Sequence, residues 1–403
     1  MISKASLLKA KYSHMYLLKT NKVFFDKLKL IYKYFYVFGK LRISSNKLEN
    51  LFYDPIPNSK KHRMEYLQFF IKSGDFNSIN VKHNLYFNSV FQILHFIILW
   101  FFTSYKIIPQ LVNPNRFAFS RNIDYLINII YVDIIKPEKI YFFNYLSVPS
   151  YLSAKTIAKK HSSINVYYVY TSGILYETCR YDEFENTNII LGSKLQFDEI
   201  KYYQNKNWMK LENCTLMHWG VDNIKLFETY SQKQTIDIGL FSSGEWARPD
   251  GFLRAENLEE IKNYKYTENV YYEVFEKIVN ELTNEKYRSQ QIKVYFHPYE
   301  KYLMNTHKIY PPFWEKLANC DNVILDISEQ PSNFFESKLA IVVFSSITID
   351  RLDYDLDTLF FLPQNKRKEF IGLPPRKVYK SYDKNIYSNF NEFRNKLKEY
   401  LND

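Results

Sequence analysis

The sequence predicts an α/β fold made of two domains, each with a parallel sheet covered by helices. The chain has 403 residues, which favours two domains, and 46% of them are hydrophobic, which is enough for ordinary cores. Short apolar runs alternate with helical patterns through most of the chain, as in doubly wound sheets. Many of these runs stop abruptly at small or polar residues, and such sheets bind ligands beyond the carboxyl ends of their strands.

A first domain is predicted over residues 1–227, and a linker over residues 228–235, where the polar run ETYSQKQT interrupts the pattern. The helix predicted at Ile123–Ile135 ends before Pro137, because a proline disfavours helix in the residue that precedes it. We also expect helices at Pro149–His161 and Lys194–Tyr203, and strands at Lys139–Phe143, Asn165–Tyr170, Asn188–Leu191 and Cys214–Met217.

The second domain, residues 236–403, repeats the alternation of strands and helices. Two doubly wound, Rossmann-like domains joined by a linker, with polar strand ends facing a central cleft, form the architecture called GT-B. The predicted strands of this domain are Asp237–Phe241, Ile292–Phe296, Asn322–Asp326, Leu339–Phe344 and Thr358–Leu362, and its helices are Tyr264–Glu285, Pro312–Ala318, a short one around Ser332–Ser337, and Asn389–Leu401.

The most apolar window is Val90–Tyr105, VFQILHFIILWFFTSY. Gln92 and His95 interrupt it, and it is shorter than the roughly 20 residues that a membrane-spanning helix needs. We therefore expect a buried helix rather than a segment that dips into a membrane, with His95 as a core histidine.

Positive charge is concentrated at the start of the chain. Residues 1–63 contain 14 Lys and Arg against three acidic residues, a net charge of +11 that equals the net charge of the whole chain. Lysines alternate with aromatic and aliphatic residues here, so the segment could lie on an anionic membrane surface. The alternative is a first βα unit whose lysines form an ordinary solvated face. No signal peptide is recognisable, and no nucleic-acid-binding motif supports a nucleic acid partner.

The three cysteines, Cys179, Cys214 and Cys320, are far apart and form no CxxC pair. They predict neither a disulfide framework nor a zinc site, and a reducing cytosol is the simplest compartment. Asp353, Asp355 and Asp357 alternate in LDYDLD, but we interpret them as a solvated turn. No metal site and no cofactor are expected.

Two short motifs stand at the ends of predicted strands in the second domain. His297-Pro298 ends the strand Ile292–Phe296, and Ser345-Ser346 ends the strand Leu339–Phe344. Ser243-Gly244 follows the first strand of the same domain. Because parallel strands present their carboxyl ends at one edge, these residues are candidates for a common phosphate site. Taken singly, Ser345 could be a helix N-cap and His297 could bind a backbone carbonyl.

The order and strand contexts of the HP and SS motifs resemble those of bacterial GT-B glycosyltransferases that use CMP-activated acidic sugars. This group includes sialyltransferases, polysialyltransferases and relatives that transfer Kdo or pseudaminic acid. The resemblance covers mainly residues 235–365. It implies that His297, Pro298, Ser345 and Ser346 bind the nucleotide, and that transfer proceeds with inversion and without a metal ion.

The sequence departs from this family in the first domain, where an acidic motif should supply the catalytic base. The matching strand end reads Thr171-Ser172-Gly173. The nearest carboxylates are Glu177 and the pair Asp182-Glu183, and we take Glu177 as the candidate base. Pro249-Asp250-Gly251 is similar to the motif but falls beyond the predicted linker.

These features predict a cytoplasmic glycosyltransferase, peripheral on the inner face of the cytoplasmic membrane. It would move a sialic acid-like nonulosonate or Kdo from a CMP donor to a capsule or lipopolysaccharide acceptor, a glycan or glycolipid. His297 would donate to the leaving phosphate, and Ser243, Gly244, Ser345 and Ser346 would hold the nucleotide. A CDP-glycerol or UDP-sugar transferase on the same fold, and a non-catalytic capsule assembly or export protein, are the alternatives.

Overall fold

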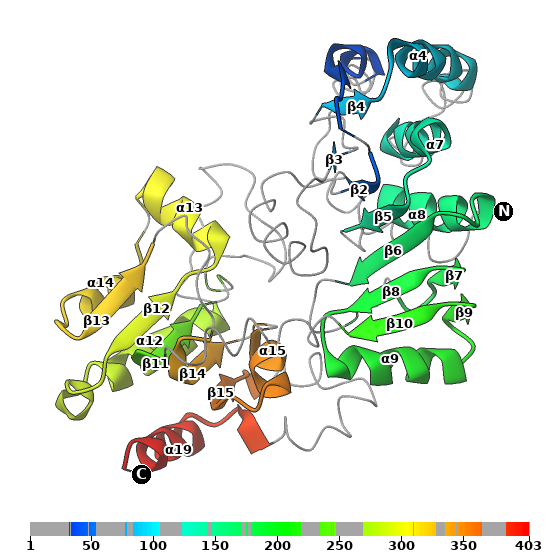
Figure 1. The fold of residues 1–403 in the computed structure, drawn as a ribbon. Helices are drawn as coiled ribbons and strands as arrows, with labels where there is room; N and C mark the ends of the chain where they lie inside the picture. Colours follow the sequence, from blue (N-terminus) through cyan, green and yellow to red (C-terminus); the bar gives the residue numbers. More distant parts are fainter. Residues whose placement is uncertain are drawn as a thin grey trace. The chain divides into compact units, whose positions relative to one another are not determined.

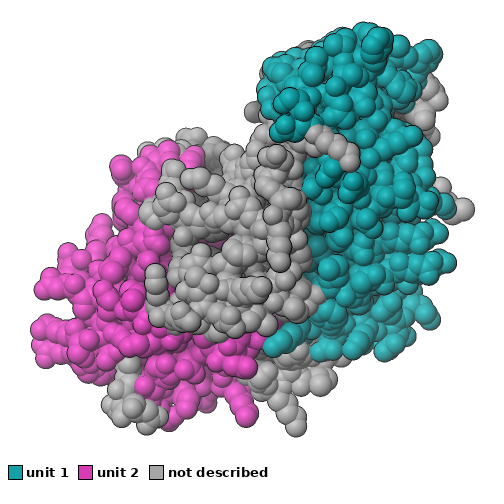
Figure 2. All heavy atoms as spheres, in the orientation of Figure 1, with its two compact units in different colours: residues 1–221 teal, residues 222–403 magenta. Residues whose placement is uncertain are grey.

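The computed structural model divides into two compact units, residues 1–221 and 222–403 (Figures 1 and 2). Of the predicted linker at 228–235, residues 228–233 lie outside the described part of the chain. The structure describes residues 32, 34–46, 48–53, 77–78, 84–104, 123–143, 147–170, 175, 179–218, 234–242, 244, 246, 269–308, 310–327, 335–343, 345, 347–364 and 384–402.

The first unit contains a parallel sheet with the strand order β10-β8-β6-β5-β2-β3. The strands and helices expected between residues 123 and 218 are confirmed to within one or two residues at their ends. Their bounds are β5 Lys139–Phe142, β6 Asn165–Tyr170, β8 Asn188–Leu191, β10 Thr215–His218, α7 Ile123–Ile135, α8 Val148–Lys160 and α9 Lys194–Asn205.

Several short strands of the first unit were not predicted. β2 (Asn50–Tyr53) lies between β5 and β3 (Asn77–Ser78) in the sheet, and its Leu51, Phe52 and Tyr53 are buried. Most of the missed strands have only two or three residues, which is too short for periodicity to reveal them without knowledge of their neighbours. The others form two separate two-stranded pairs, β1 (Leu41–Ile43) with β4 (Leu85–Phe87) and β7 (Glu183–Glu185) with β9 (Lys210–Glu212).

The apolar window forms α4, Val90–Ser104, but the prediction of a buried helix is wrong for one of its faces. Phe96 and Trp100 are buried, with the Phe96 ring 5.5 Å from Phe87. Phe91 is 83% exposed and Phe102 is 72% exposed. His95 is also exposed, so it is not a core histidine. Since α4 is apolar on every side, periodicity could not show which face packs on the protein.

The second unit contains a parallel sheet with the strand order β13-β12-β11-β14-β15-β16 (Figure 1). Numbered within this unit the order is 3-2-1-4-5-6, that of the dinucleotide-binding doubly wound fold. The strands are β11 Ile236–Phe241, β12 Ile292–Tyr295, β13 Val323–Asp326, β14 Ser337–Val343, β15 Thr358–Phe361 and β16 Ile386–Tyr387.

Alternating residues of these strands build the core of the second unit. Ile238 and Leu240 of β11 and Ile292 and Val294 of β12 belong to one buried cluster with residues of α12 and α14. Gly239 lies between Ile238 and Leu240 on β11. A Cβ at this position would lie 2.6 Å from the Ser337 hydroxyl oxygen, so only glycine fits beside β14. The helices of this unit are α12 Val270–Leu282, α13 Pro298–His307, α14 Pro312–Ala318, α15 Ile347–Asp353 and α19 Phe390–Asn402.

Two predictions for the second unit need correction, and one helix is missing from them. The helix expected around Ser332–Ser337 is wrong at its end, because Ser337 pairs with Ile236 as the first residue of β14; residues 332–334 lie outside the described residues. α12 ends at Leu282 rather than at Glu285, and the start predicted for it, Tyr264, lies outside the described residues. The helix α13, which begins directly after His297, was not predicted.

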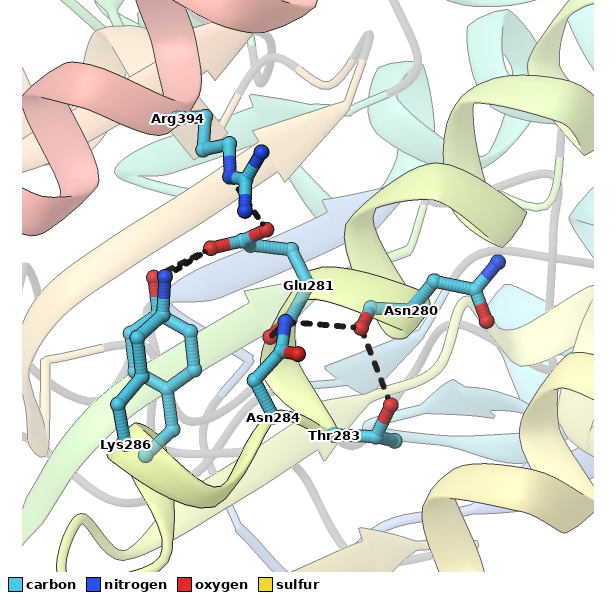
Figure 3. A network of polar contacts seen from close by, with 7 residues as sticks. Asn280, Glu281, Thr283, Asn284, Lys286 and Arg394 are labelled. Carbon is cyan, nitrogen blue, oxygen red and sulfur yellow. Dashed lines mark hydrogen bonds and ion pairs between the residues drawn. The ribbon is translucent and has the colours of Figure 1, made fainter.

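Glu281 joins α12 to the C-terminal helix α19 (Figure 3). Its side chain is 5% exposed, and one carboxylate oxygen lies 2.8 Å from Arg394 Nε of α19. The other oxygen pairs with Lys286 and accepts a hydrogen bond of 3.0 Å from the Tyr287 hydroxyl. Burial by itself would raise the pKa of Glu281, but the hydrogen bonds from Lys286 and Tyr287 and the charges of Lys286 and Arg394 hold it below its ordinary value.

The Glu281→Gln variant should lose about 1.5–3 kcal/mol of unfolding free energy at neutral pH, the range for hydrogen bonds to a charged group. Because the pKa is lowered in the folded state, this stabilisation is fully present above the ordinary value of 4.5 and disappears as the pH falls through the folded-state pKa. Urea unfolding at neutral pH and below pH 4.5 measures the difference. Glu273→Gln, on the exposed face of the same helix, is the control and should change stability by less than about 0.5 kcal/mol. Equal losses at both pH values would contradict the assignment.

Candidate functional site

Three neighbouring strands of the second unit end at one edge of the sheet. In the sheet, Phe241 of β11 pairs with Tyr295 of β12 on one side and with Val342 of β14 on the other, and all three strands are parallel. His297 and Ser345 each follow their strand by two residues. The topology therefore places the ends of these strands side by side.

The centre of this edge is where the strand order reverses. β12 and β13 lie on one side of β11 in the sheet, and β14, β15 and β16 lie on the other side. In open parallel sheets this reversal separates the two adjacent connections and leaves a crevice for a ligand. The end of β11 therefore occupies the position where such folds bind nucleotides.

Glu300 holds the ends of β11 and β12 together. It is fully buried on α13, and one carboxylate oxygen accepts a hydrogen bond of 2.6 Å from the Ser242 hydroxyl and another from the Trp246 indole nitrogen. Its second oxygen accepts the backbone N–H of His297 at 2.9 Å. A single carboxylate thus binds Ser242 directly after β11, Trp246 four residues further on, and the backbone of His297 two residues after β12.

The local sequence explains why α13 begins at this point. His297 precedes the helix, Pro298 is its first residue, and Glu300 three positions after His297 accepts the His297 backbone N–H, as in one half of a capping box. Proline is favoured at the first helical position because its missing N–H would have no partner there. The His-Pro pair is therefore also a helix start, whatever else its side chains contact.

Gly244 lies against His297. Its φ is +72°, a left-handed conformation that glycine adopts without strain. A Cβ at this position would lie 3.3 Å from Glu300 Cγ and 3.4 Å from His297 Cβ. Two predicted site residues, from the ends of β11 and β12, are thus brought into direct proximity, and the contact leaves little room for a larger residue than glycine.

Ser345 is half-buried beyond the end of β14, and its carbonyl accepts a hydrogen bond of 3.3 Å from the Thr348 N–H as α15 begins. Its backbone therefore starts a helix, which fits the N-cap interpretation as well as the phosphate interpretation. Ser243 and Ser346 lie outside the described residues, as do the side chains of Pro298 and Tyr299.

Arg351 of α15 belongs to the opposite end of the strands. Its buried guanidinium donates to the carbonyls of Ser337 at 3.1 Å, Lys338 at 3.2 Å and Asp357 at 3.0 Å, and Ser337 is the first residue of β14. Burial lowers the pKa of Arg351 to about 10, so the side chain remains charged at neutral pH. This arginine ties the amino ends of β14 and β15 together, and its guanidinium lies 6.0 Å from the centre of the Phe241 ring of β11.

The candidate base of the first unit, Glu177, lies outside the described residues, as do Thr171, Ser172 and Gly173. Nearby, the buried Glu199 of α9 accepts the Leu175 N–H at 2.6 Å and so anchors the backbone two residues before Glu177.

The two other acidic residues considered in the sequence have structural contacts. Asp182 is fully buried and accepts a hydrogen bond of 2.6 Å from the Tyr170 hydroxyl. Glu183 forms an ion pair of 2.8 Å with Lys155. Pro249-Asp250-Gly251 lies outside the described residues.

No group of three or more His, Cys, Asp or Glu side chains in the described part of the chain is arranged to hold a metal ion. Of the three aspartates interpreted as a solvated turn, Asp355 has a φ of 55° in a turn and Asp357 accepts a hydrogen bond from Tyr400. Asp353 is buried at 8% exposure, so the interpretation as a solvated turn is wrong for this residue.

Glu300, Ser242 and Trp246 were not selected from the sequence, although they organise the site. The spacing of His297-Pro298 and Glu300 was the available signal, because it is typical of a helix start. Ser242 and Trp246 lie more than fifty residues earlier in the chain, and nothing local relates them to Glu300.

Comparison with known proteins identifies no family for this chain. No family model matches the sequence, and no curated protein matches it. Among solved structures, the UDP-GlcNAc 2-epimerase of Methanocaldococcus jannaschii is similar, with a TM-score of 0.38 and 12% sequence identity over 90% of this chain and 93% of the epimerase.

Proposed function

We propose that this protein is an inverting, metal-independent GT-B glycosyltransferase that uses a CMP-activated acidic sugar. The observation that supports the proposal is the arrangement of β11, β12 and β14, whose ends carry Gly244, His297 and Ser345 at the edge where the strand order reverses. Doubly wound sheets bind nucleotides at this position. The HP and SS motifs of the sequence supply the choice of CMP as the nucleotide.

The proposed reaction needs a proton acceptor and stabilisation of the leaving group. Glu177 takes the proton of the acceptor hydroxyl, and the hydroxyl oxygen forms a bond to the anomeric carbon as the bond from that carbon to the phosphate oxygen of CMP breaks. His297 and the hydroxyls of Ser345 and Ser346 donate to the phosphate, where negative charge develops. Ser243 and Gly244 line the nucleotide site, and Glu300 positions the backbone of His297.

The proposed acceptor is a capsule or lipopolysaccharide glycan or glycolipid. A lipid-linked acceptor lies at the inner face of the cytoplasmic membrane, which agrees with the basic segment 1–63.

CMP should raise the thermal midpoint of the full-length protein more than UDP or CDP does. At a free concentration of one hundred times its Kd, a ligand that binds only the folded state adds about 2.7 kcal/mol, which is roughly 5–10 °C for a domain of this size. Differential scanning fluorimetry with CMP, CDP, UDP and AMP provides the measurement. A preference for UDP or CDP would replace the CMP donor by another one on the same fold. No response to any of the four nucleotides would overturn the proposed site.

A further inference from the structure

Exposed apolar side chains gather on one face of α4. Phe91, Leu94, Ile98, Phe101 and Phe102 recur at helical spacing and are each at least half exposed. We call these five residues the α4 face. Phe96 and Trp100 point from the opposite side of the helix into the first unit, where both are buried. The α4 face is therefore not the core-facing stripe of an amphipathic helix.

The segment formed by residue 32 and residues 34–46 packs along α4 through Tyr34 and Phe38 and extends the apolar surface. The Phe38 and Phe101 rings stack at 5.6 Å, and the Tyr34 and Trp100 rings are 5.1 Å apart. From this segment, Tyr32 and Phe35 are exposed by 65% and 58%. Elsewhere in the described part of the chain, large hydrophobic residues are exposed only at scattered positions such as Met217 and Ile324. Contiguous apolar surfaces of this kind mark binding sites for a membrane or a partner.

The chemistry around the α4 face favours lipid as its partner. The sequence from 84 to 104 has no Asp, Glu, Lys or Arg. The five side chains of the face are hydrocarbon, and the exposed His95 is the polar side chain beside them, so the face lacks most of the polar rim that protein interfaces usually have. The segment beside it carries Lys40 and Arg42 and no acidic residue between 32 and 46. The net charge of residues 1–63 adds to this basic character, which complements an anionic bilayer.

The length of α4 decides how it would meet the bilayer. Its 15 residues span roughly 22 Å, less than the 30 Å of a hydrocarbon core. Across the described residues, no helix meets the length and hydropathy needed to span a membrane. With Phe96 and Trp100 packed in the protein, only one side of α4 is available, which fits a helix that lies in the plane of the lipid surface.

We infer that the α4 face inserts into the outer part of an anionic bilayer, with Lys40 and Arg42 contacting lipid headgroups. The inference does not depend on the proposed enzymatic function. It also changes the expectation from the sequence, which placed membrane contact in residues 1–63 and a buried helix at Val90–Tyr105. The exposed α4 face adds an apolar contribution to membrane binding that salt does not screen. Membrane binding should therefore persist in part at salt concentrations that screen the basic residues.

The full-length protein should co-sediment with phosphatidylcholine vesicles that contain phosphatidylglycerol. The double variant Phe91→Ser/Phe102→Ser should bind them at least about tenfold more weakly, because two highly exposed rings no longer enter the lipid. Both positions are exposed, so the variant should unfold at the same urea concentration as the wild type. Ile324→Ser, at an exposed position on β13 of the other unit, is the matched control and should bind like the wild type.

Charge reversal separates the two contributions to binding. Lys40→Glu/Arg42→Glu should remove most of the preference for phosphatidylglycerol over pure phosphatidylcholine vesicles, while Phe91→Ser/Phe102→Ser should weaken binding to both. Wild-type binding that is undetectable, or equal in all four proteins, would overturn the inference. So would a wild-type dimer in light scattering that Phe91→Ser/Phe102→Ser converts to monomer without any change in vesicle binding, because the α4 face would then contact a second copy of the chain.

Discussion

Replacing Glu300 by alanine should lower the unfolding free energy of the second unit by about 3–5 kcal/mol. The change removes the acceptor for the Ser242 hydroxyl, the Trp246 indole and the His297 N–H, in a place where the carboxylate is fully buried. Buried donors without an acceptor are costly because they lose their bonds to water on folding. Urea unfolding followed by tryptophan fluorescence measures the effect, since Trp246 and Trp314 are both buried in this unit.

A more conservative change tests the same geometry. Glu300→Gln keeps one oxygen for Ser242 and Trp246 but places an amide NH₂ opposite the His297 N–H, so it should lose about 1–3 kcal/mol. Glu315→Gln, an exposed position on α14, should stay within about 0.5 kcal/mol of the wild type. If alanine at position 300 cost no more than glutamine at position 315, the carboxylate would not organise the strand ends. Loss of the thermal response to CMP in Glu300→Ala would further link this carboxylate to the proposed site.

Replacing His297 by alanine should reduce sugar transfer by roughly 10²–10³-fold, the cost of removing one donor to a developing negative charge. His297 lies two residues beyond β12, next to Gly244 and outside the core cluster, so stability should fall by no more than about 1 kcal/mol. Transfer from CMP-activated sialic acid and Kdo to a soluble acceptor is the measurement. The soluble acceptor keeps the assay independent of membrane binding.

Two comparisons separate a role in transfer from a role in the helix start. His297→Asn retains a residue that caps helices well, so it should keep α13 stable while it still loses most activity. Asn305→Ala, an exposed position two turns further along α13, should leave transfer unchanged. Near-wild-type turnover in His297→Ala, or a loss of activity that follows the loss of stability across these variants, would contradict the assigned role.

The sequence was informative where local patterns are strong. The apolar runs that became β11, β12 and β14 are bounded by small or polar residues, and their strand character follows from composition and length. The same runs predict that His297 and Ser345 follow the ends of two strands. The order of the strands in the sheet has no local signature, because it depends on the path of each crossover connection, and it is this order that makes the three ends neighbours.

The sequence is misleading where a residue's environment comes from distant parts of the chain. α4 is apolar on all sides, so its hydropathy could not distinguish the buried side with Phe96 and Trp100 from the exposed α4 face. The local sequence predicts a helix at Ser337, but its pairing with Ile236 makes it the first residue of β14. Trp100 packs on Tyr34 and Ser337 pairs with Ile236, and each of these partners lies more than sixty residues away in the sequence.

The sequence by itself determined the α/β class, most strands of the second unit and the basic character of residues 1–63, because these depend on composition and short-range periodicity. Only the tertiary structure decided that Glu300 accepts hydrogen bonds from residues more than fifty positions away, that Gly244 lies against His297, and that α4 turns an apolar face outward. The physical reason is that burial and hydrogen bonding depend on which distant segments come into contact, and local residue patterns do not determine those contacts.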